Sequence, residues 1–160
     1  EWIQTMKPDP IVFLCANPIP EMWPWEAKEA GARIVATGRS DFPNQVNNSL
    51  GFPGIFRGTL DVMATTITDE MCIEAARELA KTAEDKGMHE DYLIPTMDEW
   101  EVFPREAAAV GRMAIKQGVA RLRISKAKLF EMAEETIKRS RGIVQQNMKK
   151  GFIPMPPAGL

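Results

Sequence analysis

The stretch from Pro10 to Gly38 constrains the fold of this chain most, because it has the pattern of a strand, a helix and a second strand joined by short connections. PIVFLCAN (10–17) is a short continuous apolar run, which predicts a strand covered on both faces. EMWPWEAKEAG (21–31) predicts a short helix, and RIVATG (33–38) predicts the second strand. Such a unit builds a parallel sheet with a right-handed crossover, so we expect an α/β fold.

The remainder of the chain is predicted to be mainly helical. The predicted helical segments, in chain order, are 43–50, 52–64, 68–87, 104–118 and 125–150. We expect Pro53 and Gly54 to break the path between the first two segments, and Pro104 to occupy the first position of its helix. The proline-rich ending 151–160 predicts an extended tail.

Composition narrows the class of protein. A net charge of −2 gives no general attraction to nucleic acid or membrane, and no apolar stretch approaches the roughly 20 residues of a membrane span. Cys15 and Cys72 lie in apolar runs, so we expect reduced thiols in the core of a cytoplasmic protein rather than a disulfide. The chain begins at Glu1 rather than Met, and EWIQTM has the pattern of a helix end. We therefore expect a piece of a longer or processed protein.

Positive charge is concentrated in the last predicted helix. Residues 121–150 contain nine Lys and Arg but only three Glu, whereas the earlier residues are acidic overall. This helix could bind phosphate, dock onto an acidic part of the same protein or of a subunit, or simply expose a solvated basic face, which is the commonest case. We expect its apolar stripe of Leu129, Met132 and Ile137 to pack on another domain or on a second subunit.

Candidate catalytic residues are few. His89 is the only histidine and has no second metal ligand nearby, and Tyr92 is more typical of a loop anchor. The acids of DEWE (98–101) precede a helix, where carboxylates usually serve the helix dipole rather than a metal. The sequence contains no GxGxxG, Walker A or CxxC motif.

Side-chain amides are the most informative polar groups. Asn17 follows the first predicted strand, and GRSDFPNQVNN (38–48) follows the second. Ligands of open parallel sheets bind beyond the carboxyl ends of the strands, so we expect the amides of Asn17, Asn47 and Asn48 to converge on one crevice. Taken singly, each of these residues is more often a turn or helix cap.

Several sequence blocks also resemble a known family. The run from PIVFLCANPIPE through TGRSDFPNQVNNSLGFPGIFRGTLDV closely resembles the carboxyl-terminal half of the nucleotide-binding domain of prokaryotic-type malic enzymes. ITDEMCIEAARELA, IPTMDEWEVFPREAAAV and QGVAR continue the resemblance in order, so it covers at least residues 1–121. The resemblance implies a partial Rossmann-like NAD(P)-binding domain over 1–103, followed by carboxyl-terminal helices and tail over 104–160.

The resemblance implies a part in converting malate to pyruvate and CO2, with NAD or NADP as cofactor and Mg or Mn as metal. It implies that Asn17 and Asn48 bind substrate, and that Asn17 and Asn47 lie on the cofactor side. The family's Tyr acid, Lys base, metal ligands and glycine-rich loop all belong upstream of Glu1, so no catalytic or metal-binding residue is expected in this chain.

The same resemblance implies an amino-terminal domain as partner and a homo-oligomer, and we expect the chain alone to be inactive. The alternative is a non-catalytic ligand-binding or interaction module derived from the same fold. The choice between NAD and NADP stays open, because the residue that reads the ribose 2′ position follows an earlier strand.

Overall fold

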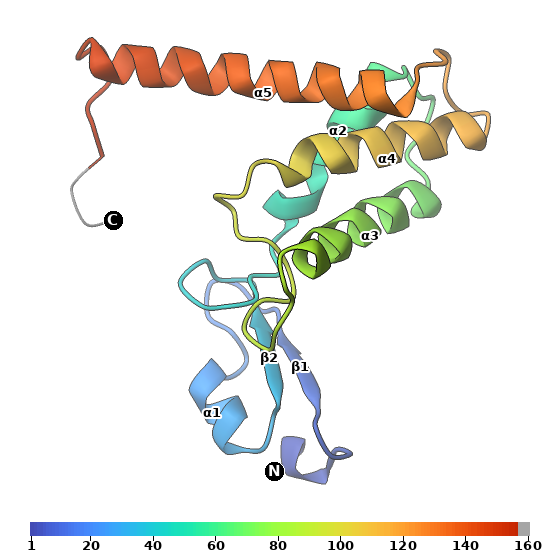
Figure 1. The fold of residues 1–160 in the computed structure, drawn as a ribbon. Coiled ribbons are helices and arrows are strands. Elements are labelled where there is room, and N and C mark those ends of the chain that lie inside the picture. The colour runs from blue at the N-terminus through green and yellow to red at the C-terminus, as the bar shows by residue number, and fades with distance from the viewer. Residues whose placement is uncertain (157–160) are drawn as a thin grey trace.

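The structure, a computed structural model, describes residues 1–156. Its elements are η1 (Ile3–Thr5), β1 (Ile11–Leu14), α1 (Pro24–Glu29), β2 (Ile34–Thr37), α2 (Asn48–Asp61), α3 (Asp69–Asp85), α4 (Val102–Lys116) and α5 (Lys126–Lys149). Figure 1 shows β1, β2 and α1 grouped at one end of the molecule and the helices α2 to α5 at the other. Residues 151–156 form no helix or strand, and the remainder of the predicted tail lies outside the described residues.

The strand–helix–strand unit forms as predicted. β1 and β2 pair in parallel over four residues, from Ile11 opposite Ile34 to Leu14 opposite Thr37. α1 lies between them in sequence and begins with Pro24, whose fixed φ suits the first helical position. A small core of Leu14, Ala27, Ala32 and Val35 joins the helix to the sheet. The predicted α/β class is therefore confirmed.

The prediction that both faces of β1 are covered is wrong. Ile11 and Phe13 are 51% and 57% exposed, whereas Leu14 is buried. Side chains of a strand alternate between the two faces of a sheet, and within the described residues β1 pairs only with β2, so one face and one edge stay open. Cys15 follows this strand and is also exposed, so the prediction of a core thiol at this position is wrong.

The predicted break at Pro53 and Gly54 does not occur, because α2 runs through both residues. Close packing on α4 offsets the backbone hydrogen bond that proline cannot make. A Cβ atom on Gly54 would lie 2.6 Å from Cβ of Glu106, and one on Gly58 would lie 2.4 Å from the carbonyl oxygen of Ala107. These glycines therefore allow α2 and α4 to approach each other closely.

The helices α2 to α5 share a second core. Its fully buried members are Val62, Met71, Ala75, Ala108, Val110, Ala114 and Leu129. Thr68 caps α3 by accepting a hydrogen bond from the backbone N–H of Met71, as predicted. Cys72 lies on the exposed face of α3, so its predicted burial is wrong: the buried face of the helix contains the preceding residue, Met71.

Only the first residue of the predicted apolar stripe of α5 is fully buried in this chain; Met132 and Ile137 are half-buried, and their packing on another domain or subunit stays a prediction. Leu129 is fully buried against α4, so the prediction that it faces another domain or subunit is wrong. Further along α5 burial decreases, and Val144 is 41% exposed. Figure 1 shows the carboxyl-terminal part of α5 extending past the other helices.

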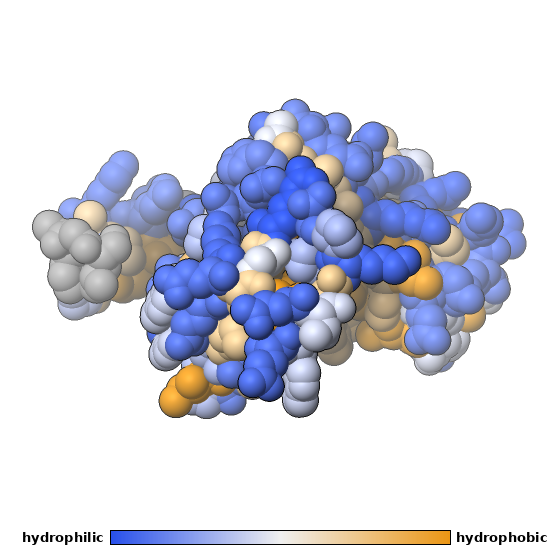
Figure 2. Space-filling model, turned by 90° about the horizontal axis from the view of Figure 1, so that it is seen from below, coloured by the Kyte–Doolittle hydropathy of each residue, from blue (hydrophilic) through white to orange (hydrophobic). Residues whose placement is uncertain are grey.

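The strand-bearing end exposes several large hydrophobic side chains, among them Ile11, Phe13 and Ile19. Figure 2, which views this end, shows a mainly hydrophilic surface with separate hydrophobic patches. Within residues 1–156 no helix is long and apolar enough to cross a membrane.

Glu106 is the unusual side chain of the helical core. It is fully buried on α4 beside Gly54, and neither carboxylate oxygen has a hydrogen-bond partner among the described residues. Burial, and then the nearby negative charge of Glu78, raise the pKa of Glu106 to about 9. The carboxyl group is therefore neutral near pH 7 in the folded chain.

The close approach of α2 and α4 predicts opposite effects of two glycine substitutions. Gly58→Ala should lower the free energy of unfolding by about 1–3 kcal/mol, because the new Cβ would clash with the backbone of α4. Gly142→Ala on α5 is the matched control, since a Cβ there meets nothing within 4 Å and should stabilise by about 0.5–1 kcal/mol. Urea unfolding of both variants measures the difference, and equal effects would contradict the packing argument.

The burial of Glu106 predicts that stability falls as the pH rises. The folded chain keeps a proton that the unfolded chain loses above about pH 4.5, so stability is lost between pH 4.5 and about 9. The slope approaches about 1.4 kcal/mol per pH unit for one proton. Urea unfolding across this range should show that slope in the wild type and not in Glu106→Gln. Glu84→Gln, at an exposed position on α3, should keep the wild-type slope, and a wild-type slope in Glu106→Gln would contradict the prediction.

Candidate functional site

The carboxyl ends of β1 and β2 open onto a small cavity. It has a volume of about 230 Å³ and is lined by Cys15, Asn17, Gly38, Val46, Asn47 and Asn48. Because the strands are parallel, the segments that follow them emerge at the same edge of the sheet. The structure thus brings together all three amides that the sequence predicts to converge. A broader depression of about 450 Å³ adjoins it and is lined by Asn17, Pro18, Gly38, Arg39, Ser40, Asp41, Gln45 and Asn47.

Asn47 has a structural task at the start of α2. Its Oδ1 accepts hydrogen bonds from the backbone N–H and the hydroxyl of Ser49, at 3.0 and 2.7 Å. Its Nδ2 donates to the carbonyl oxygen of Gly38 at 3.0 Å, which ties the helix start to the end of β2. An amide NH2 group has two donors, so one N–H of Asn47 stays available to a ligand.

Asn17 and Asn48 differ from Asn47 in having free amides. Both residues are exposed, and neither side chain forms a hydrogen bond with any residue of 1–156. They line the same cavity from opposite segments, one after β1 and one at the first position of α2. Each amide offers an acceptor and two donors without adding charge. This pair is suited to orient a polar ligand.

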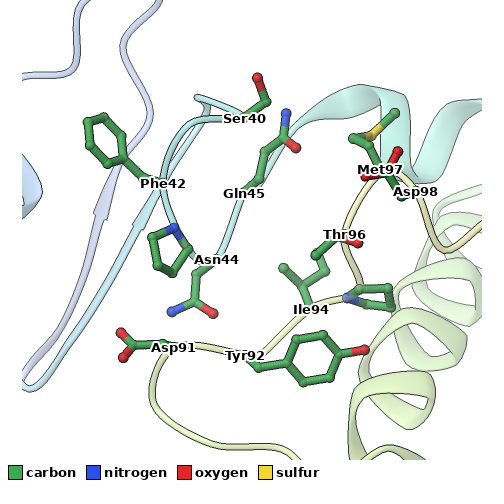
Figure 3. Close-up of a pocket in the computed structure, with 12 residues that line it drawn as sticks. Ser40, Phe42, Asn44, Gln45, Asp91, Tyr92, Ile94, Thr96, Met97 and Asp98 are labelled. Atoms are coloured by element: carbon green, nitrogen blue, oxygen red, sulfur yellow. The ribbon is translucent and has the colours of Figure 1, made fainter. Parts of the chain in front are cut away.

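Asn44 fixes the segment between β2 and α2. It is buried, with a φ of 55° that asparagine tolerates better than most residues. Its Nδ2 donates to the carbonyl oxygens of Val35 and Glu90, at 3.2 and 2.7 Å, and its Oδ1 accepts from the backbone N–H of Leu93 at 2.8 Å. Figure 3 shows this side chain pointing to the segment with Asp91, beside a cavity of about 370 Å³.

Gln45 lies between this cavity and the depression at the strand ends. Its backbone bridges to Thr37, and its side chain forms no hydrogen bond with any described residue. In Figure 3 it points away from Asn44, toward the side where Ser40 lies. Gln45 thus adds a further free amide beside the site.

Arg39 connects the two strand-end segments, and the sequence interpretation missed it. Its Nε and Nη2 donate to the two carboxylate oxygens of Asp41, at 2.8 and 2.7 Å, and its Nη1 donates to the carbonyl oxygen of Pro18 at 3.0 Å. The guanidinium also lies 5.7 Å from the ring centre of Trp23 and 5.8 Å from that of Phe42. Hydrogen bonding to Arg39 lowers the pKa of Asp41. The sequence GRSD contains the signal for this pair, because it places an arginine two residues before an aspartate.

Tyr92 and Glu99 support the neighbouring loop. The hydroxyl of Tyr92 donates to Glu99, and burial followed by this carboxylate raises the pKa of Tyr92 to about 12. Burial acts to raise the pKa of Glu99, but hydrogen bonds from Lys86, from the backbone N–H of Thr96 and from Tyr92 lower it to about 2. The interpretation of Tyr92 as a loop anchor is confirmed.

The two hollows at the strand ends are lined mainly by uncharged polar residues. The side chains of His89 and Tyr92 line neither the cavity nor the depression at the strand ends, and within residues 1–156 no three His, Cys, Asp or Glu lie close enough to hold a metal. The depression also contains two charged residues, Arg39 and Asp41, which form an ion pair with each other. The free amides of Asn17 and Asn48 are therefore the groups best placed to contact a ligand.

Comparison with known proteins gives consistent results. The family described as "Malic enzyme, NAD binding domain" matches residues 2–115. The chain is 50% identical over 138 residues to a Bacillus subtilis protein named "Bifunctional malic/malolactic enzyme", covering 86% of this chain and 33% of that protein. It is 48% identical over 121 residues to a Geobacillus stearothermophilus "NAD-dependent malic enzyme", covering 76% of this chain and 25% of that protein.

A solved structure agrees with these sequence matches. The crystal structure of Entamoeba histolytica malic enzyme superposes with a TM-score of 0.95 at 54% identity, over 98% of this chain and 32% of that one. The predicted fold class, a part of a Rossmann-like NAD-binding domain with helices, is therefore confirmed. The chain spans about a third of the length of the Bacillus and Entamoeba proteins.

The different use of adjacent amides predicts different effects on stability. Asn47→Ala should lower the free energy of unfolding by about 1 kcal/mol, because it removes the cap of α2 and the bond to Gly38. Asn48→Ala should change it by less than about 0.5 kcal/mol, because the exposed amide has no partner to lose within the described chain. Chemical denaturation of the two variants provides the measurement. Equal losses would show that both amides are structural.

Proposed function

The chain belongs to the malic enzyme family, and from this premise we propose that it is the substrate- and cofactor-orienting segment of an enzyme that oxidatively decarboxylates malate to pyruvate and CO2. The observation that carries the proposal is the pair of free amides, Asn17 and Asn48, on one cavity at the ends of β1 and β2. Such an arrangement binds and orients a small polar ligand at the place where parallel sheets bind nucleotides and substrates.

Each amide of the site has a proposed role. Asn17 and Asn48 bind malate, whose hydroxyl and carboxylate groups match the amide donors and acceptors. The remaining N–H of Asn47, together with Asn17, lies on the cofactor side of the cavity. Because the amides are uncharged, they orient the hydroxy acid without competing for a cation. Accurate orientation matters because a misplacement of about 1 Å can cost a hundredfold in rate.

The cofactor of the proposed reaction is NAD or NADP. When bound, it accepts a hydride from the hydroxyl-bearing carbon of malate. The free amides of Asn17 and Asn48 would contact polar groups of the substrate, and Asn17 would also contact the cofactor. The two amides hold the substrate hydroxyl and carboxylate in line for that transfer.

The remaining parts of the proposal concern groups outside the described cavities. A Mg or Mn ion, a Tyr acid, a Lys base and an amino-terminal domain would complete the active site, and the enzyme would be a homo-oligomer. The boundary between 1–103 and 104–160 stays a prediction. A cytoplasmic location fits the two free, exposed cysteines, because exposed thiols persist in reducing compartments.

The proposal predicts kinetic losses on removal of either free amide. In a complete enzyme that carries this segment in place of the matching one of the Bacillus subtilis relative, Asn17→Ala or Asn48→Ala should lower kcat/KM for malate about ten- to hundredfold. Losing a hydrogen bond to a charged substrate costs about 1.5–3 kcal/mol. The assay follows the reduced cofactor, with malate and Mn²⁺ supplied.

Asn147→Ala is the matched control. This residue lies on α5, away from the cavity, and should leave the kinetics unchanged. Wild-type kinetics in both site variants would contradict the assigned roles. Malate-dependent cofactor reduction by the 160-residue chain alone would contradict the proposal that it only orients ligands, because acid–base steps contribute about 10²–10⁴-fold each.

A further inference from the structure

We infer that Arg39 is a positioning residue of this site, which ties the segment after β1 to the segment after β2 and so sets the distance between the amides of Asn17 and Asn48. This inference rests on the proposed function and adds a residue that acts through the positions of Asn17 and Asn48.

The first step is that Asp41 fixes the direction of the Arg39 guanidinium. The pair is bidentate, with Nε 2.8 Å from Oδ1 and Nη2 2.7 Å from Oδ2. The guanidinium is planar and rigid, so two hydrogen bonds to one carboxylate fix its orientation. The direction of the third nitrogen, Nη1, is then fixed as well. Hydrogen bonding to Asp41 raises the pKa of Arg39, and the same bonds lower that of Asp41, so both groups stay charged. The guanidinium is therefore preorganised.

The second step is that Nη1 of Arg39 binds the backbone of Pro18, the residue that follows Asn17. It donates to the carbonyl oxygen of Pro18 at 3.0 Å. Within residues 1–156 this is the only side-chain hydrogen bond between 15–22 and 38–48. A carbonyl oxygen one residue from Asn17 cannot move far without moving the Asn17 backbone. Arg39 thus holds the Asn17 amide in place relative to β2 and the start of α2.

Two aromatic rings that contact each other also lie close to the same arginine. The guanidinium carbon lies 5.7 Å from the ring centre of Trp23 and 5.8 Å from that of Phe42, within the range of cation–π attraction. Trp23 stacks in parallel on Trp25, with ring centres 5.2 Å apart. Trp23 directly precedes α1, so its contacts with Arg39 and Phe42 join the connection between β1 and α1 to the segment after β2, as the Pro18 bond does.

The test uses Arg39→Ala and Arg39→Lys in the complete enzyme that carries this segment. Arg39→Ala should lower kcat for malate about ten- to hundredfold and change KM less, because a displaced amide weakens alignment more than binding. Arg39→Lys keeps the positive charge but cannot form the bidentate pair with Asp41. Its kcat should therefore lie between those of the wild type and Arg39→Ala. Added methylguanidinium should partly restore kcat in Arg39→Ala and not in Asn17→Ala.

Arg33→Ala is the matched control. Arg33 forms ion pairs with Glu90 and Asp9, its side chain is 53% exposed, and it lies before β2 rather than after it. Its removal should leave kcat and KM unchanged. Wild-type kinetics in Arg39→Ala, or equal losses in Arg33→Ala, would overturn the inference.

Hydrogen exchange gives a readout that does not depend on turnover. In Arg39→Ala the backbone N–H of Ala16, which donates to Glu21, should exchange faster, while those of α3 keep their wild-type rates. Faster exchange throughout, including α3, would mean a general loss of structure and would overturn the positioning role. If the unsubstituted enzyme did not turn over malate, the proposed function would fail, whereas the exchange of the Ala16 N–H would still decide whether Arg39 holds this segment.

Discussion

The parallel pairing of β1 with β2 is the constraint on which the site depends. Their register, from Ile11 opposite Ile34 to Leu14 opposite Thr37, makes both strands end at one edge of the sheet. Antiparallel strands would place these ends at opposite edges. Gly31, at a φ of +108°, ends the short crossover helix and returns the chain to β2. The contact between Arg39 and Pro18 then spans the distance that this register sets.

The asparagines near the site divide into structural and free ones, and their surroundings explain the division. Asn44 and Asn47 lie where the backbone leaves regular structure, and their amides satisfy carbonyl and N–H groups that a strand or helix would otherwise pair. Asn17 and Asn48 lie at the rim of the cavity, and both of their amides are free within the described chain. One residue type thus both builds the walls of the site and supplies its binding groups.

The sequence predicts local features of this fold better than contacts between distant segments. The strand–helix–strand unit and the cap at Thr68 depend on neighbouring residues, and both are confirmed. Both cysteines are exposed, against the prediction. Burial of Cys15 would need another element to cover the end of β1, and burial of Cys72 depends on which face of α3 packs on the core; an apolar run in the sequence determines neither. The part played by Arg39 could not be read from the sequence, because its partners include Pro18, 21 residues away.

The two free amides of the site are held by different parts of the fold. Asn48 begins α2, and the glycines of α2 pack against α4, so the helical core fixes its position. The neutral, buried Glu106 lies beside Gly54 at the same contact, which links the protonation of that core to the packing of α2. Asn17 instead lies in a segment outside both strands, held across the site through Arg39. A change in the helical core should therefore displace Asn48, and a change at Arg39 should displace Asn17, so the spacing between the two amides depends on both supports at once.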